Sequence, residues 1–284
     1  MFLNSKLVED IIEIAIKEDI GTGDVTTLST IPEDAVTTGI IYAKASGVVA
    51  GIPIAEMVFR KLNRDLRFSA QKKDGDRVAQ GDILASVSGS ARSILTGERV
   101  ALNLLQRLSG IATYTSKIVE LLNGFETSVV DTRKTTPGLR VIEKYAVKIG
   151  GGKNHRFGLY DAVLIKDNHI KVAGGIKKAV MMARGNIPHT MKIEVETEDL
   201  AGVHEALEAG ADIIMLDNMD FVTVEKAVGL IAGRALTEVS GGINEDNIKE
   251  YAKKGVNLIS VGALTHSVKA LDISLDVGEI KTRC

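Results

Sequence analysis

The sequence of 284 residues has one cysteine, only a small excess of acidic over basic residues and no long apolar run. A single cysteine, Cys284, excludes an intrachain disulfide and a cysteine-based metal site. The formal net charge of -2 argues against a nucleic-acid-binding or membrane-surface protein, which would normally carry a basic excess. We therefore expect a cytoplasmic protein that binds neither nucleic acid nor membrane.

Apolar segments are short throughout the chain. Glu9, Asp10, Glu13 and Lys17 interrupt the apolar residues near the N-terminus, which argues against a signal-peptide core. No run approaches the ~20 apolar residues that span a bilayer. With 45% hydrophobic and 25% charged residues, the composition is ordinary for a globular protein, and the length suits one large α/β domain or two unequal ones.

A pattern repeats between Ser128 and Gly262, in which a short apolar run ends in polar residues and a helical stretch follows. The polar residues after these runs lie at positions 131–134, 166–169, 194, 217, 240–242 and 262. Such runs are typical of parallel βαβ units, whose ligands bind at the carboxyl ends of the strands. About six units predict an open, incomplete TIM-like α/β barrel.

The N-terminal part lacks this repeat and predicts a mixed sheet with helices. An amphipathic helix over 5–18 would place Leu7, Ile11, Ile14 and Ala15 on one face, with Ser5 as its N-cap. A second helix, over 93–122 with a break at Gly110, would bridge the two halves.

These patterns predict two domains of the α/β class. An α/β sandwich domain is expected over 1–110 and a barrel over 111–267. In the C-terminal segment 268–284, Ile273, Leu275 and Val277 alternate with polar residues. This period favours an antiparallel strand that returns to the first domain.

Cationic side chains gather around the first two barrel strands. Arg133 and Lys134 follow one strand, whereas His155 and Arg156 precede the next and Lys166 follows it. Arginine offers a planar fork and lysine a mobile point charge, so the mixture suits a ligand with several anionic groups. For His155 a purely structural role is an equal alternative.

Two carboxylates, Glu194 and Asp217, are expected at the ends of the next two strands. They could hold Mg²⁺ through waters or stabilise a developing positive charge. Salt bridges to Lys166 or Arg156 are the alternative. Glu196 shares a strand face with Glu194 and competes for the role, but it lies nearer to the following helix.

Glycine-rich loops follow the last two barrel strands. Ser240, Gly241 and Gly242 precede a helix that Asn244 is expected to cap, and Gly262 and Ala263 follow Val261. Backbone N–H groups at such positions bind phosphate. His266 could approach the phosphate or be an ordinary surface histidine.

Several motifs together closely resemble the quinolinate phosphoribosyltransferases, also called nicotinate-nucleotide pyrophosphorylases (carboxylating). They are TRKTTPGLR, GGGKNHRFGL, VLIKDNH, KIEVE, DIIMLDN, EVSGGI and ISVGALTHS, with EDIGTGDVTT and GERVALNLLQRLSGIAT nearer the N-terminus. The resemblance spans nearly the whole chain. It implies a cytoplasmic homodimer with shared active sites, or a hexamer of dimers. It also implies a Mg²⁺-dependent transfer of phosphoribose from phosphoribosyl pyrophosphate to quinolinate, with release of pyrophosphate and CO₂, in NAD biosynthesis.

The resemblance also implies roles for individual residues. Lys134, Lys166, Glu194 and Asp217 would be catalytic, and the last two would contact the metal indirectly, through pyrophosphate or water. The substrates would be bound by Arg99, Thr132, Arg133, Lys134, His155, Arg156, Lys166, Glu194 and Asp217, and the phosphate by Ser240, Gly241, Gly242, Val261, Gly262, Ala263 and His266. Arg99 would enter the neighbouring subunit's site, although the sequence alone predicts a surface helix residue paired with Glu98 or Asn103.

Two other functions remain open at this point. One is a paralogous phosphoribosyltransferase of a molybdenum-transport operon with a different acceptor. The other is a biotinyl or lipoyl carrier, because the segment 74–84 resembles the hairpin of such domains. The carrier reading is disfavoured, because Lys44 is followed by Ala45 and Ser46 and no methionine-flanked lysine is present.

Overall fold

The computed structural model describes residues 6–278, which form two compact units. The first unit contains residues 6–116, 135–151 and 267–278, and the second contains 117–134 and 152–266. Helix α5 (Arg140–Ile149) belongs to the first unit, whereas the predicted boundaries placed it in the barrel. The reason is its packing, since Tyr145 Oη donates to Asp74 at 2.6 Å and Gly150 lies against Ala112 and Thr115.

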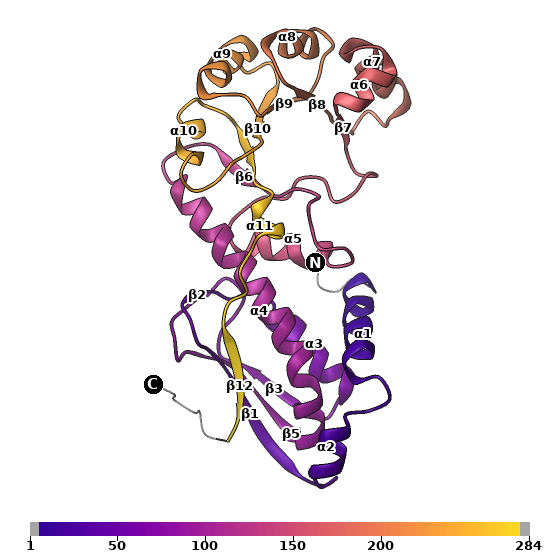
Figure 1. The fold of residues 1–284 in the computed structure, drawn as a ribbon, viewed down its shortest axis with the longest axis vertical. Helices are drawn as coiled ribbons and strands as arrows, with labels where there is room; N and C mark the ends of the chain where they lie inside the picture. Colours follow the sequence, from indigo (N-terminus) through magenta and orange to yellow (C-terminus); the bar gives the residue numbers. More distant parts are fainter. Residues whose placement is uncertain (1–5, 279–284) are drawn as a thin grey trace. The chain divides into compact units, whose positions relative to one another are not determined.

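The first unit is built on a four-stranded antiparallel sheet, in the order β12-β1-β5-β3 (Figure 1). The strands are β1 (Val36–Ala43), β3 (Arg67–Ala70), β5 (Ile83–Ser90) and β12 (Ile273–Val277). Strand β12 pairs with β1 from Ala43↔Ile273 to Gly39↔Val277, so the predicted return of the C-terminal segment is confirmed. A separate pair joins β2 (Gly47–Val48) to β4 (Arg77–Val78).

The helices of this unit are α1 (Lys6–Ile20), α2 (Val25–Thr30), α3 (Ile52–Leu62) and the first part of α4 (Ala91–Leu121). The predicted buried face of α1 is wrong. Val8 and Ile12 are buried, while Leu7 and Ile14 are exposed, because α1 contacts α3 and α5 through a stripe one residue further round the helix. The predicted N-cap, Ser5, lies outside the described residues.

Helix α4 is continuous over 31 residues, so the break predicted at Gly110 is wrong. A Cβ at Gly110 would lie 2.4 Å from the carbonyl oxygen of Lys269. Nearby, the Leu271 N–H donates to the Gln106 carbonyl at 3.0 Å. The glycine therefore lets the C-terminal segment cross close to the helix on its way to the sheet.

The second unit contains a six-stranded parallel sheet, in the order β6-β11-β10-β9-β8-β7 (Figure 1). Its strands are β6 (Ser128–Val130), β7 (Val163–Ile165), β8 (Ile193–Thr197), β9 (Ile213–Asp217), β10 (Leu236–Ser240) and β11 (Leu258–Ser260). Among the described residues β6 and β7 are the edges and do not pair with each other. The predicted open barrel of six βα units is confirmed.

Helices follow the strands, and those after β7, β8 and β9 pack against the sheet. They are α6 (Asp167–Ala173), α7 (Ile176–Asn186), α8 (Leu200–Glu208), α9 (Phe221–Ile231), α10 (Ile248–Ala252) and α11 (Ala263–His266). Apolar residues on their inner faces, such as Val180, Val203 and Val224, are buried. Within residues 6–278, no helix combines the length and apolar character needed to cross a membrane.

Candidate active site at the strand ends

The strand order brings the predicted cationic, acidic and glycine-rich segments to one edge of the sheet in the second unit. Because all six strands are parallel, their carboxyl ends meet at the same edge. The polar residues that follow these strands therefore surround a common region, as the sequence predicted. The register also pairs Asp217 on β9 directly with Ser240 on β10.

Lys134, Gly262 and His266 lie together after strands β6 and β11. A Cβ at Gly262 would be 3.0 Å from His266 Nε2 and 3.1 Å from Lys134 Cδ. Thr265 Oγ1 donates to the Lys134 carbonyl at 2.8 Å, and Thr132 Oγ1 accepts from the Lys134 N–H at 3.0 Å. A lysine and a histidine beside a glycine backbone can receive a phosphate group.

The loop after β10 is held against Asp217 and Asn218. Gly241 has φ +96°, and a Cβ there would lie 2.1 Å from Asn218 Oδ1, so this position requires glycine. Asn218 Nδ2 in turn donates to Asp217 Oδ2 at 2.7 Å.

The helix expected after this loop begins later than predicted. Asn244 does not cap it, because Asn244 lies in a turn that accepts from the Asp246 N–H, and α10 begins only at Ile248. Ser240 therefore ends β10, and Gly241 and Gly242 lie in a loop and not at the start of a helix.

Lys166 pairs with Glu196, and this changes the assignment of the carboxylates. Their side chains form an ion pair, in which Glu196 is largely buried and Lys166 is partly exposed. Strand β8 continues past Glu194 to Thr197, so the premise that Glu194 ends the strand is wrong. The structure places Glu196 nearer the carboxyl edge, and Glu194 deeper in the barrel.

Two arginines, Arg133 and Arg156, lie near each other. Burial lowers the pKa of the Arg156 guanidinium, and the positive charge of Arg133 lowers this pKa further. Arg156 Nη1 also donates to the Ala162 carbonyl at 3.1 Å. Since arginine stays charged in proteins, two neighbouring guanidinium groups favour the binding of an anion between or beside them.

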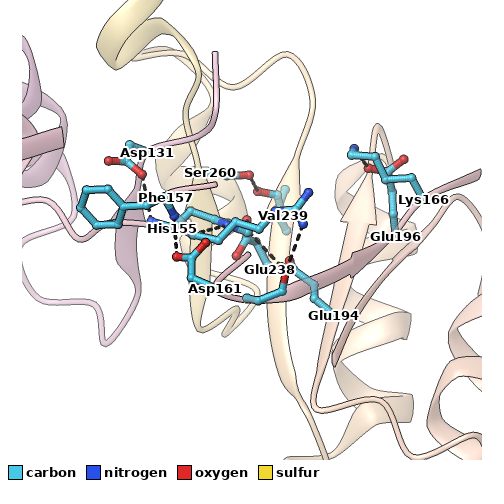
Figure 2. A network of polar contacts seen from close by, with 12 residues as sticks. Asp131, His155, Phe157, Asp161, Lys166, Glu194, Glu196, Glu238, Val239 and Ser260 are labelled. Atoms are coloured by element: carbon cyan, nitrogen blue, oxygen red, sulfur yellow. Dashed lines mark hydrogen bonds and ion pairs between the residues drawn. The ribbon is translucent and has the colours of Figure 1, made fainter. Parts of the chain in front are cut away.

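His155 enters the barrel interior and contacts two buried glutamates (Figure 2). Its Nε2 lies 2.9 Å from Glu194 Oε2 and 3.6 Å from Glu238 Oε1. Its Nδ1 accepts the Arg156 N–H at 2.7 Å, so the ring proton is on Nε2 and points to Glu194. Both ring nitrogens are thus engaged within the protein, which favours the structural alternative for His155 over direct contact with an anion.

Each of the two glutamates has a carboxylate oxygen without a hydrogen-bond partner among the described residues. Glu194 Oε1 and Glu238 Oε1 are buried and find no hydrogen-bond partner among residues 6–278. Burial raises the pKa of Glu238 to about 8, and the negative charge of Glu194 raises it as well. The Glu238 carboxyl is therefore readily protonated near neutral pH.

A cavity of about 450 Å³ adjoins this cluster. His155, Arg156, Lys192, Glu194 and Glu238 contribute to its lining, together with residues that begin strands, such as Ile213 and Leu258. The cavity therefore extends from the cluster toward the amino ends of the strands.

Within the described chain, His155, Glu194 and Glu238 form one group that could hold a metal ion, with ligand atoms within 4.8 Å of one another. This group suits Mg²⁺ poorly. Mg²⁺ prefers oxygen ligands, and His155 Nε2 carries a proton in this arrangement. The carboxylates of Asp217 and Glu196, near the strand ends, fit Mg²⁺ better.

Arg99 lies in the first unit, on α4. Its side chain is exposed, and Nη2 lies 3.7 Å from Glu98 Oε1. This is the surface pairing that the sequence alone predicted. A role in a neighbouring subunit stays a prediction.

Sequence reasoning missed Glu238, Thr265 and the buried Asp131. A signal existed for Glu238, because it precedes Ser240 by two residues on the same strand and so shares its face. The repeat includes Asp131 among the polar residues that follow a strand, but its role comes from contacts with a distant segment. No local pattern marks Thr265.

The fold and the candidate site define an open α/β-barrel protein with cationic, acidic and glycine-rich residues at its strand ends. Two family models match the chain: the quinolinate phosphoribosyl transferase N-terminal domain over residues 24–109 and the C-terminal domain over residues 111–276. The chain belongs to the quinolinate phosphoribosyl transferase family.

Individual relatives agree with this assignment. A probable nicotinate-nucleotide pyrophosphorylase (carboxylating) of Bacillus subtilis is 49% identical over 260 residues, covering 92% of this chain and 90% of the relative. A similarly named protein of Methanocaldococcus jannaschii is 47% identical, covering 94% and 96%. Among solved structures, NadC from Streptococcus pyogenes is 44% identical, with a TM-score of 0.91 and coverage of 96% and 97%.

Proposed function

We infer that this chain is a pentosyltransferase that transfers phosphoribose from phosphoribosyl pyrophosphate to quinolinate. The products are nicotinate mononucleotide, pyrophosphate and CO₂, which is a step of NAD biosynthesis. The observation that carries the inference is the pair Arg133 and Arg156 near Glu194, together with the acidic and glycine-rich residues at the carboxyl ends of the parallel strands. The names of the relatives, which cover nearly the whole chain, support the same reaction.

The acceptor would be bound by the guanidinium groups of Arg133 and Arg156. Quinolinate is an aromatic diacid, and each planar guanidinium can pair with one carboxylate. These residues orient the pyridine nitrogen toward the sugar, which lowers the barrier by fixing the geometry of attack. Lys134, after β6, supplies a further cation for the pyrophosphate.

In the transfer, the bond between C1 of the ribose and the pyrophosphate oxygen breaks, and the electron pair leaves with pyrophosphate. The pyridine nitrogen forms the new bond to C1. Carboxylates near the sugar stabilise the positive charge that develops there, and Glu196 and Asp217 are the side chains suited to this role by position. Glu194 is less suited, because His155 engages it in the barrel interior.

Decarboxylation follows from the charge on the new pyridinium ring. The bond to the departing carboxylate breaks, the ring takes up the electron pair, and the carbon is then protonated. No nucleophilic side chain is needed for these steps. The cationic residues of this chain would chiefly hold the diacid in place.

Mg²⁺ is part of the proposal, as a metal that neutralises the pyrophosphate leaving group. Asp217 and Glu196 would hold it, directly or through water. The 5′-phosphate of the sugar would lie at Ser240, Gly241 and Gly242 and at Val261, Gly262 and Ala263. Lys134 and His266, which approach Gly262, support this placement.

We further propose a cytoplasmic homodimer, or a hexamer of dimers, with Arg99 contributing to the site of the neighbouring subunit. The exposure of Arg99 on α4 is compatible with this role. Mixing Arg99→Ala and Lys166→Ala chains tests it. One intact composite site should restore part of the activity, whereas no recovery after proven subunit exchange would contradict shared sites.

Release of CO₂ from quinolinate in the presence of phosphoribosyl pyrophosphate and Mg²⁺ tests the reaction itself. Nicotinate, which lacks the second carboxylate, should be a poor acceptor. The variant Arg133→Ala should raise the quinolinate KM and cost about 2–4 kcal/mol of transition-state stabilisation. Turnover of another acceptor instead of quinolinate would favour the paralogous phosphoribosyltransferase.

A further inference from the structure

Asp131 is a fully buried carboxylate directly after strand β6. Its Oδ1 accepts the His155 N–H at 2.9 Å, and its Oδ2 accepts Asn154 Nδ2 at 2.6 Å. Figure 2 shows this carboxylate facing the backbone next to His155. A buried carboxylate that receives two such hydrogen bonds fixes the position of its donors strongly.

The backbone beside Asp131 binds the same segment. The Asp131 N–H donates to the Lys153 carbonyl at 3.1 Å, and the Lys153 N–H donates to the Val129 carbonyl at 2.8 Å. Val130 and Lys153 thereby form a parallel bridge at the outer edge of β6. Three consecutive residues, 153–155, are thus attached to the end of this strand.

The far side of the segment has its own carboxylate. Asp161 accepts the N–H groups of Phe157 and Gly158 at 2.7 and 2.9 Å. Arg156 lies between the two anchored stretches, and its own N–H is held by His155 Nδ1. The backbone of Arg156 is therefore fixed from both sides before any ligand binds.

The geometry points to Asp131 as a positioning residue that sets the Asn154–Arg156 segment so that Arg156 receives the acceptor's carboxylate. The inference rests on the proposed function, because it assigns Arg156 to the acceptor. Asp131 itself touches no reacting atom and acts through its hydrogen bonds to the segment. Preorganisation of this kind lowers the cost of binding without adding a contact to the ligand.

Exchanging Asp131 and Asn154 tests the inference. In Asp131→Asn, the amide has a single acceptor oxygen, so its NH₂ group must face one of the two donors. In Asn154→Asp, two carboxylates face each other. In the double variant, the amide introduced at position 131 can donate to the carboxylate introduced at position 154 and still accept the His155 N–H. Complementarity and net charge are then both restored.

Each single variant should raise the quinolinate KM roughly tenfold, with smaller changes in kcat and in the KM for phosphoribosyl pyrophosphate. The double variant should recover most of this loss. A wild-type KM in folded Asp131→Asn would overturn the inference. So would a double variant no better than Asn154→Asp, a comparison that remains available if Asp131→Asn fails to fold.

Asp212→Asn is the matched control. Asp212 Oδ2 also accepts one backbone N–H, from Ile193 at 2.7 Å, and one side-chain N–H, from Arg184 at 2.7 Å, but it lies before β9 and outside the proposed site. This variant should lower Tm and leave the quinolinate KM unchanged. An equal rise of KM in the control would show that general loosening, and not positioning, is responsible.

Hydrogen exchange of the 153–158 peptide separates this inference from the proposed function. The single variants should exchange faster there without any substrate, and the double variant should return toward the wild type. An inactive wild type with this exchange pattern would refute the reaction and retain the anchoring by Asp131. An active wild type with unchanged exchange in Asp131→Asn would support the reaction and refute the anchoring by Asp131.

Discussion

Buried carboxylates in the two units differ in how completely their oxygens are hydrogen-bonded. In the first unit, Glu143 is fully buried; its Oε1 accepts Arg107 Nε at 2.7 Å and its Oε2 accepts the Thr136 N–H at 3.1 Å. Arg107 Nη2 also donates to Thr136 Oγ1 at 2.7 Å. In the second unit, Glu194 and Glu238 each keep a buried oxygen without a hydrogen-bond partner among the described residues.

The difference distinguishes a buried carboxylate with a structural role from buried carboxylates with a functional role. Glu143 has an opposite charge and a backbone donor, which is the arrangement expected where the acid only ties segments together. Glu194 and Glu238 face a cavity and repel each other, a cost that folding alone does not explain. Unfavourable groups of this kind cluster where a protein binds ligands or performs chemistry.

Arg107→Met should give the largest loss of stability, because it leaves Glu143 buried without its cation. We expect about 3–5 kcal/mol less free energy of unfolding, measured by urea denaturation. The double variant Arg107→Met with Glu143→Met should recover most of the loss, since it removes the uncompensated charge. A loss below about 1 kcal/mol in the single variant would mean that Glu143 is no better paired than Glu238.

Glu238→Gln should make the protein more stable at alkaline pH. The folded-state pKa of about 8 exceeds the unfolded value of 4.5, so between these pH values the folded protein binds more protons and loses stability as pH rises. Glutamine stays neutral, so the variant avoids this loss. Relative to the wild type it should gain about 1–3 kcal/mol at pH 8 and much less at pH 5, measured as unfolding free energy. A pH-independent difference would contradict the shift.

Tyr145→Phe removes one of the hydrogen bonds that the Asp74 carboxylate accepts. Asp74 would still accept the Gly51 and Ile52 N–H groups at 2.9 Å, so no buried charge is left unpaired. The expected loss is about 0.5–1.5 kcal/mol with unchanged kinetics. A much larger loss in thermal unfolding would show that Tyr145 does more than hydrogen-bond to Asp74.

Lys166→Met should have the smallest effect on stability and a large effect on activity. Its pairing with Glu196 is partly exposed, so we expect less than about 1 kcal/mol in unfolding free energy. Turnover should fall about 100-fold or more, because a cation is lost at the strand ends. Comparable activity with reduced stability would place Lys166 with Arg107 among the structural residues.

The sequence predicted the parts of the fold that have a local cause. Apolar runs followed by helices predicted six parallel strands, and alternation at Ile273, Leu275 and Val277 predicted the strand that returns to the first sheet. Gly110 was misinterpreted, because a glycine that permits close approach of a distant segment looks the same as one that ends a helix. The predicted start of α10 was wrong by a few residues, and the predicted buried face of α1 was wrong by one residue. Both differences are within the usual uncertainty of local patterns.

The sequence predicted the residue types of the candidate site better than it predicted which side chains contact each other. Strand order brings Lys134, Asp217, Ser240 and Gly262 to one edge, as the repeat implied. Glu196 was a foreseen competitor of Glu194, but the sequence could not decide between them, because the choice depends on where β8 ends and on which carboxylate Lys166 reaches. The role of Asp131 could not be predicted either, since its hydrogen-bond partners lie 23 and 24 residues further along the chain.

The two edge strands of the parallel sheet, β6 and β7, are short, and this has a consequence for solubility. An open barrel exposes backbone donors and acceptors to which another molecule could add a strand, which is a route to aggregation. Here β6 and β7 have only three residues each, against five in β8, β9 and β10. Moreover, the backbones of Val129 on β6 and of Asp131 directly after it already hydrogen-bond to Lys153. A foreign strand would find too short a template to bind.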